Sequence, residues 1–177
     1  MEFKDFTFHG LKTIDEDGTF EGALSVYGNI DFQDDIVDPG AFTKTLKEGG
    51  NVVPMLWQHD TKQPIGRLTL TDTPTALLAK GKLLLKIPKA QEAYELLKEG
   101  VLKGMSIGYD TIKAIPSENG IRRLKELRLF EGSLVTFPSN NLAVVTGVKQ
   151  ATAAELADLQ RFREASNDLK RFYESML

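Results

Sequence analysis

The chain has 177 residues, of which 41% are hydrophobic and 27% are charged, a composition ordinary for one globular domain with room for a terminal appendage. A formal net charge of −3 and the lack of a concentrated basic patch argue against a nucleic-acid surface. There is no cysteine, which excludes disulfides, thiol catalysis and cysteine-zinc sites.

The first residues, Met1–Asp5, lack a basic region followed by an apolar one, and no apolar run approaches the length of a membrane span. We therefore expect a cytoplasmic protein without membrane contact.

The N-terminal half alternates strand and helix signals. Residues 20–28 alternate apolar or small with other side chains, the period of a strand with one buried face. Asp38 and Pro39 favour a helix start that Gly49 and Gly50 end. The nearby acidic residues lack the ligand spacing of a calcium loop, so we interpret them as a solvated loop plus a helix cap.

Short strands dominate the rest of the chain. In chain order, the segments that read as strands are 52–59, 67–70, 76–80, 82–87, 106–115, 121–130, 134–137 and 142–148. A helix opens at Pro88 and ends at Gly100. This order predicts a mainly β, α+β fold: a closed or nearly closed antiparallel β-barrel with flanking helices.

The C-terminal segment differs in kind. Thr152–Glu155 has the capping-box pattern, and apolar residues then recur at helical spacing as far as Met176. We expect a barrel domain at residues 1–148 and one long amphipathic helix within a tail at 149–177. The helix is expected either to pack against the barrel or to mediate self-association or partner docking.

Ser106 is a candidate nucleophile. It lies between Gly104 and Gly108 in an otherwise apolar strand, and glycine neighbours would leave its hydroxyl unscreened. The alternative is a small residue at a strand bulge. A serine hydroxyl needs a base to take its proton.

His59 is the better placed of the two histidines to act as that base. It ends the apolar run that starts at Val52, where a strand would deliver it to the barrel rim, whereas His9 lies in a polar N-terminal segment. The alternative is a histidine that only opens a turn before Asp60 and Pro64.

Several motifs in one order resemble the prohead (capsid-maturation) proteases of tailed phages, which are related in fold to the herpesvirus assemblins. They span roughly residues 20–147. The matching segments are Asp34–Phe42, Met55–Asp60, Gln63–Arg67, Gly104–Tyr109 and Leu129–Asn140.

The resemblance implies an assemblin-like barrel and a third catalytic group. It gives Glu131 the position of the acid in the phage proteases, where assemblins use a second histidine. Glu126 is the runner-up, although its odd offset along the strand would place it on the opposite face. Asp60 is the third candidate for this acid, because a residue adjacent to His59 in the chain is poorly placed to hydrogen-bond to its ring. Arg67 is expected in a surface ion pair, or helping through a water.

The resemblance also implies the biology. It indicates a serine endopeptidase, without cofactor or metal, that acts inside the immature capsid in the host cytoplasm. Its substrate would be the capsid or scaffold protein, and it would finally digest itself. The alternative is a catalytically inactive scaffold or capsid-binding module on the same barrel. A metal hydrolase is disfavoured because one histidine and scattered carboxylates do not form a zinc site.

Overall fold

A computed structural model describes residues 14–147, apart from the side chain of Glu118. His9 and the expected tail helix lie outside the described residues, so those two expectations stay predictions. Within the described range no helix is long and apolar enough to cross a membrane.

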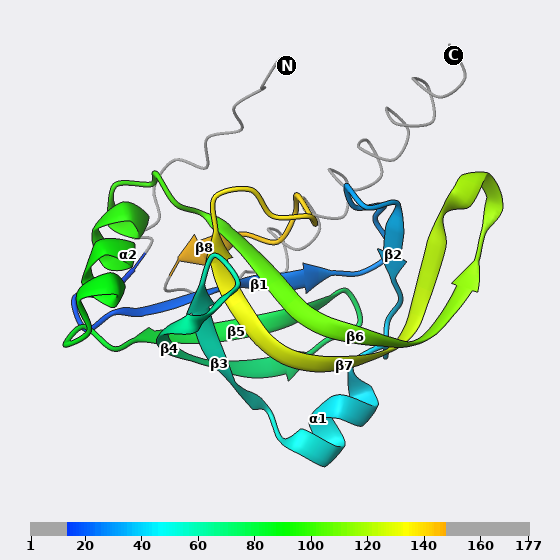
Figure 1. Cartoon of the computed structure of the whole chain (residues 1–177), viewed down its shortest axis with the longest axis horizontal. Helices are drawn as coiled ribbons and strands as arrows, with labels where there is room; N and C mark the ends of the chain where they lie inside the picture. The colour runs from blue at the N-terminus through cyan, green and yellow to red at the C-terminus, as the bar shows by residue number, and fades with distance from the viewer. Residues whose placement is uncertain (1–13, 148–177) are drawn as a thin grey trace, which may run out of the picture.

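The described chain is mainly β, with two α-helices. In order the elements are β1 (Thr19–Val26), β2 (Asp35–Val37), α1 (Thr43–Gly49), β3 (Val52–Trp57), β4 (Asp60–Asp72), β5 (Ala76–Leu83), α2 (Pro88–Lys98), β6 (Gly104–Pro116), the short 3-10 helix η1 (Glu118–Gly120), β7 (Arg122–Val135) and β8 (Val145–Gly147). These strands form one sheet in the order β2-β7-β3-β4-β5-β1-β8, with β6 paired to β7 (Figure 1).

β7 is the strand on which the sheet is organised. It runs antiparallel to β6 in a long hairpin that reaches beyond the body of the sheet, and parallel to both β2 and β3 (Figure 1). The prediction of an antiparallel barrel was therefore wrong for two ladders. An apolar alternation reports which face of a strand is buried, and it carries no information on the direction of the neighbouring strand.

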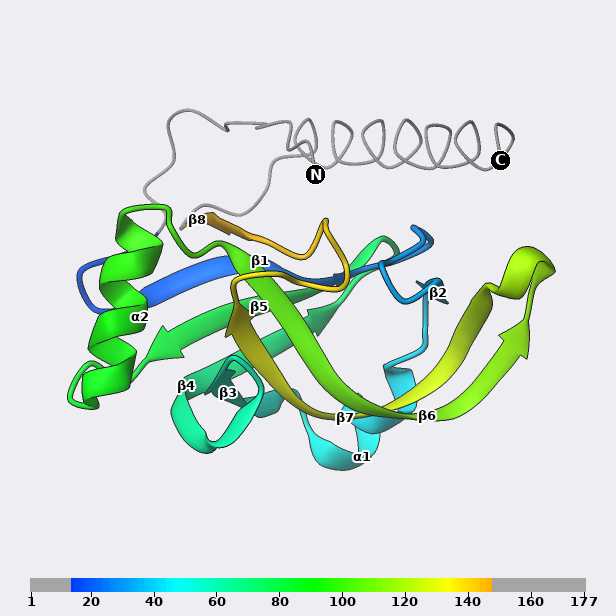
Figure 2. The same cartoon turned by 45° about the horizontal axis from the view of Figure 1, so that its top comes forward.

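The sheet curls strongly, so that the start of β6 approaches the segment that leads into β8 over a short stretch (Figure 2). Val144 bridges Gly104, the Met105 amide donates to the Ala143 carbonyl at 2.8 Å, and the Val145 amide donates to the Lys103 carbonyl at 2.9 Å. Within the described residues a continuous closed barrel is not formed. In place of the expected closed or nearly closed barrel, the described residues form a curled, half-barrel sheet.

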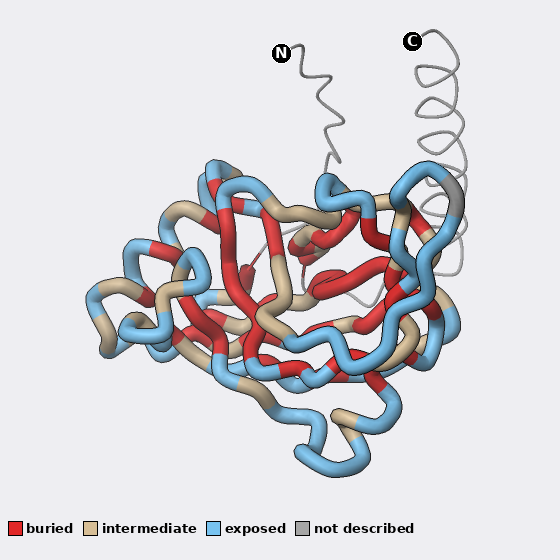
Figure 3. Tube along the Cα trace, turned by 45° about the vertical axis from the view of Figure 1, so that its right-hand side comes forward, coloured by how far each residue is buried: buried red, intermediate tan, exposed pale blue. Residues whose placement is uncertain are grey.

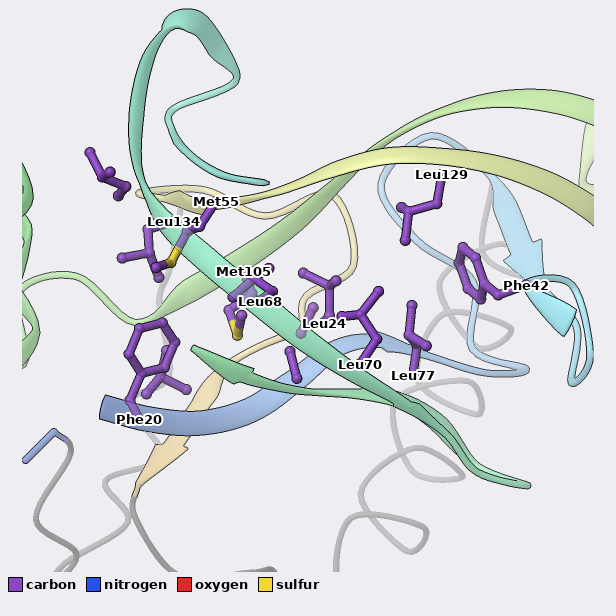
Figure 4. Packing of buried hydrophobic residues seen from close by; sticks show 14 of the residues in the cluster. Phe20, Leu24, Phe42, Met55, Leu68, Leu70, Leu77, Met105, Leu129 and Leu134 are labelled. Carbon is purple, nitrogen blue, oxygen red and sulfur yellow. The ribbon is translucent and has the colours of Figure 1, made fainter. Parts of the chain in front are cut away.

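The concave side of the curled sheet holds the hydrophobic core (Figure 4). Large side chains from different strands meet there with no exposed surface, among them Phe20, Met55, Leu68, Met105 and Leu134. Each such side chain contributes about 1.5–3 kcal/mol on full burial. The outer half of the β6–β7 hairpin is by contrast mostly exposed (Figure 3).

Two element boundaries differ from the predictions for packing reasons. Gly81 does not separate two strands; it lies inside β5, where an added Cβ would meet the Phe20 ring at 2.3 Å, so the glycine leaves room for that ring. Likewise, the expected strand at 134–137 is the end of β7, which continues without a break to Val135.

The helices differ in how well the sequence predicted them. α2 has Pro88 in its first turn and buries Ala90, Ala93 and Leu97 on one face, as predicted. α1 begins at Thr43, later than the predicted start. Asp38 does not cap it, because its carboxylate pairs with β7 instead.

Candidate active site

His59 lies in a tight turn between β3 and β4. Trp57 pairs with Asp60, and both intervening residues have positive φ, 51° for Gln58 and 61° for His59. Two positive φ values in a two-residue hairpin loop are typical of a type I′ turn, which usually takes asparagine, aspartate or glycine. Two larger side chains in this conformation cost on the order of 1–3 kcal/mol each. The histidine is thus placed just past the strand end, with 43% of its side chain exposed.

Contacts with the end of β7 hold this turn. The Gln58 amide nitrogen donates to the Leu134 carbonyl at 3.0 Å, and the Gln58 side chain both donates to Thr136 Oγ1 at 2.8 Å and accepts from the Thr136 amide at 3.2 Å. The His59 amide donates to Ser133 Oγ at 3.2 Å. These bonds offset the backbone strain and fix the position of the imidazole.

Glu131 lies against the imidazole. Its Oε1 is 2.7 Å from His59 Nδ1, and its Oε2 accepts a hydrogen bond from the Ser133 hydroxyl at 2.7 Å. Glu131 is only 7% exposed. A carboxylate only accepts, so Nδ1 carries the proton and Nε2 of the neutral ring is the free acceptor. The arrangement can therefore orient a general base.

β7 brings these groups together through the period of a strand. Glu131 and Ser133 are two residues apart and lie on the same face, while Gly132 turns to the core, where an added Cβ would meet Leu68 at 2.4 Å. Ser133, fully buried, joins Glu131 to the His59 backbone. The sequence analysis missed Ser133, although its spacing of two from Glu131 was a signal that it shares the same face.

Ser106 reaches the same site from β6. It is paired directly with Ser133 in the antiparallel β6–β7 ladder, and residues directly opposite in such a ladder present their side chains on one face with Cβ atoms about 4.5–5.5 Å apart. Ser106 and His59 line one cavity of about 100 Å³. The two residues predicted as nucleophile and base are thus neighbours in space, 47 positions apart in the sequence (106 − 59).

The two glycines near Ser106 leave space for groups of β7, a role that differs from the predicted one of leaving the Ser106 hydroxyl unscreened. An added Cβ at Gly108 would lie 2.2 Å from Glu131 Oε1, and one at Gly104 would lie 2.5 Å from the Val135 carbonyl oxygen. Gly108 leaves space for the carboxylate, and Gly104 permits close approach of the backbone of β7.

Glu126 and Asp60, the other predicted acids, bond to groups other than the imidazole. Glu126 pairs with Lys44 of α1 at 2.9 Å. Asp60 accepts from the Lys62 amide and from the Gln63 side chain, and these bonds hold the pKa of Asp60 below its ordinary value. Arg67 is exposed on β4 and forms no ion pair with the residues the structure describes, so the expected surface pair is absent there.

The acidic segment before α1 is not the solvated loop that was expected. Asp35, 1% exposed, accepts two hydrogen bonds from Arg122 at 2.7 and 2.5 Å. Asp38, 4% exposed, pairs with Arg123 and Lys125. Burial by itself raises the pKa of Asp38, but the hydrogen bonds from its two cationic partners outweigh burial and hold the pKa below its usual value. These pairs fix the segment to β7.

Among the described residues no cluster of three or more histidine, aspartate or glutamate side chains is arranged to hold a metal ion.

The model of the caudovirus prohead serine proteases matches residues 9–158. The chain is 31% identical over 144 residues to the prohead protease of Enterobacteria phage HK97, and 29% identical over 161 residues to the capsid polyprotein of Pseudomonas phage PAJU2. A third relative is the prohead protease of Escherichia phage T5, with 29% identity over 139 residues.

These matches cover 78%, 84% and 73% of this chain, and 63%, 23% and 65% of the respective relatives, so the chain spans less than two thirds of the length of each. Among solved structures, the KSHV protease in complex with a hexapeptide phosphonate inhibitor superposes with a TM-score of 0.53 at 13% identity. The superposition covers 81% of this chain and 74% of that one. At that identity the likeness concerns the fold alone.

Proposed function

The chain belongs to the family of caudovirus prohead serine proteases, and we propose that it is a serine endopeptidase that cleaves capsid or scaffold protein during prohead maturation. One observation carries the proposal. The 2.7 Å contact between His59 Nδ1 and Glu131 leaves Nε2 as the free acceptor of a histidine that shares a cavity wall with Ser106.

The proposed chemistry is acyl transfer. His59 Nε2 takes the Ser106 hydroxyl proton as Oγ attacks the peptide carbonyl carbon, and the imidazolium then gives that proton to the leaving amine. Water, deprotonated by the same nitrogen, attacks the resulting ester and frees Ser106. Glu131 orients the ring and stabilises the imidazolium, while Ser133 fixes the second carboxylate oxygen.

Substrate and setting are proposed from the relatives, which are named as prohead proteases and as a capsid polyprotein. We take the substrate to be the capsid or scaffold protein, and the setting to be the immature capsid in the host cytoplasm. Self-cleavage near the junction with the tail, at residues 150–154, belongs to the same proposal; that junction lies outside the described residues. Neither a nucleic-acid nor a membrane partner is part of the proposal, and self-association through the barrel or the tail is a separate expectation.

One gel tests the function against its alternative, an inactive scaffold or capsid-binding module. The cognate capsid precursor is incubated with wild type and, in parallel, with Ser106→Ala. An endopeptidase yields discrete precursor fragments with wild type only. A precursor that stays intact in both samples while co-purifying with both proteins identifies the binding module instead.

A further inference from the structure

Gln58 occupies a backbone position that glutamine seldom takes. It is the first residue of the two-residue turn between β3 and β4, and its φ is 51°. Turns of this kind favour asparagine, aspartate or glycine, because a larger side chain at positive φ costs free energy. Gln58 is exposed, so burial in the core does not account for it. A glutamine here therefore calls for an explanation in the contacts of its carboxamide.

The Gln58 carboxamide contacts Thr136 through both of its ends. Nε2 donates to Thr136 Oγ1 at 2.8 Å, and Oε1 accepts from the Thr136 amide at 3.2 Å. Asparagine would suit the turn, but its side chain is one methylene shorter and falls short of this pair of atoms. The reach to Thr136 thus explains why a longer amide occupies a strained position.

The segment 136–140, which follows β7, forms one wall of the cavity at the active site. Ser139 and Asn140 line this cavity together with Ser106 and His59. The threonine that the carboxamide contacts is the first residue of the segment. The two contacts therefore join the turn that carries the base to the wall that a bound substrate would touch.

The far end of the segment has anchors of its own. The Asn140 side chain donates to the Val26 carbonyl at 2.9 Å, and the Ser139 carbonyl accepts from the Phe32 amide at 3.0 Å. Loss of the Gln58 contacts would leave these bonds in place. It should therefore loosen the turn more than the wall.

We propose that Gln58 is a positioning residue, which holds the imidazole of His59 by tying its turn to the cavity wall at Thr136. The bonds of the turn's two backbone amides to β7, at Leu134 and Ser133, keep the turn itself formed. The side-chain contacts then restrict the remaining movement of the ring, because a general base must stay in line with the nucleophile. The inference rests on the proposed function, because it takes His59 to be that base.

Gln58→Asn tests the proposal because it relieves the strain and removes the two contacts together. The protein should stay folded with an unchanged or higher Tm, while kcat for a peptide substrate falls about tenfold and KM changes little. A residue with a purely structural role would not produce this combination. Gln91→Asn, the same change at an exposed glutamine of α2, is the matched control and should keep wild-type kcat.

Thr136 supplies a second, independent arm of the test. Thr136→Val removes the hydroxyl with little change in shape and should lower kcat about threefold, whereas Thr136→Ser keeps the hydroxyl and should keep kcat. In Gln58→Asn the contact is already absent, so adding Thr136→Val should have no further effect. Wild-type kcat in Gln58→Asn, or a Thr136→Val effect that is just as large in the Gln58→Asn background, would overturn the inference.

NMR keeps the inference separate from the proposed function. The ring signals of His59 are compared at one pH in Ser106→Ala and in two double variants, which add Gln58→Asn or Gln91→Asn to it. The Gln58→Asn double variant should move the His59 signals toward the values of free histidine, and the Gln91→Asn double variant should not. That result supports the positioning role even if wild type cuts nothing, an outcome that would refute only the function. Identical His59 signals in all three proteins refute the positioning role whether or not cleavage occurs.

Discussion

Gly108 lies directly opposite Glu131 in the β6–β7 ladder, and a methyl group at position 108 would sit 2.2 Å from the carboxylate oxygen that contacts His59. Gly108 therefore contributes to the site because it has no side chain, which leaves room for the Glu131 carboxylate. Because Glu131 is buried and bonded on both oxygens, it has nowhere to shift without losing a partner.

We predict that Gly108→Ala displaces the Glu131 carboxylate and lowers kcat by about 10²-fold or more. A loss of this size is expected when a catalytic group is misplaced, and it is smaller than the loss expected when the acid is removed. Peptide cleavage kinetics measure it. Gly49→Ala, where an added Cβ meets nothing within 4 Å, is the control and should stay fully active. Wild-type kcat in Gly108→Ala would show that Glu131 is not required where it lies.

Replacing Glu131 itself should separate the acid from its runner-up. Glu131→Gln keeps the shape but not the charge that stabilises the imidazolium, so kcat should fall by about 10²–10⁴ while the protein stays folded. Glu126→Gln removes a partly exposed pair with Lys44, which contributes little to stability because water screens it, and should leave cleavage unchanged. The reverse pattern, active Glu131→Gln beside inactive Glu126→Gln, would overturn the assignment.

Ser133 is predicted to be a positioning residue. Ser133→Ala leaves Glu131 Oε2 and the His59 amide without a partner, which should lower the free energy of unfolding by about 1–3 kcal/mol. Looser placement of His59 should also lower kcat by about tenfold or more with little change in KM, because no substrate contact is lost. Denaturant melts and steady-state kinetics measure the two effects. A change confined to stability would reduce Ser133 to a structural role.

Self-cleavage is predicted near residues 150–154, a stretch of mostly small residues between the predicted barrel domain and the predicted tail helix, because nicking concentrates at junctions of this composition. The family match continues to residue 158, slightly past this junction. Intact mass after prolonged incubation should reveal loss of a C-terminal fragment from wild type and none from Ser106→Ala. Equal masses in the two samples, under conditions where a peptide is cut, would contradict it.

The sequence carried the local features of this fold better than the long-range ones. Strand periodicity and glycine flanks indicated Ser106, and the apolar run before His59 indicated a strand. Periodicity says nothing about which strands pair, so the parallel pairing of β3 with β7 could not be predicted. That pairing is what brings the His59 turn beside Glu131.

The burial of two charged side chains was also not predicted from the sequence. Asp35 was interpreted as part of a solvated loop and Asp38 as a helix cap, because acidic residues seldom lie buried without partners. Their partners, Arg122, Arg123 and Lys125, lie more than 80 positions later and became visible only when the parallel β2–β7 pairing set them side by side. The role of Ser133 depended on the same kind of information, since its hydroxyl acts on a turn 74 positions earlier.

We propose that Ser106 is a nucleophile activated by His59. A fluorophosphonate probe, which forms a covalent bond with an activated serine oxygen, tests it directly when the labelled protein is digested and mapped by mass spectrometry. We predict a stoichiometric adduct on Ser106 in wild type, strongly slowed labelling in His59→Ala, and none at that position in Ser106→Ala. Cleavage of the capsid precursor by a protein whose Ser106 stays unlabelled, or labelling of another serine that abolishes cleavage, would contradict the account.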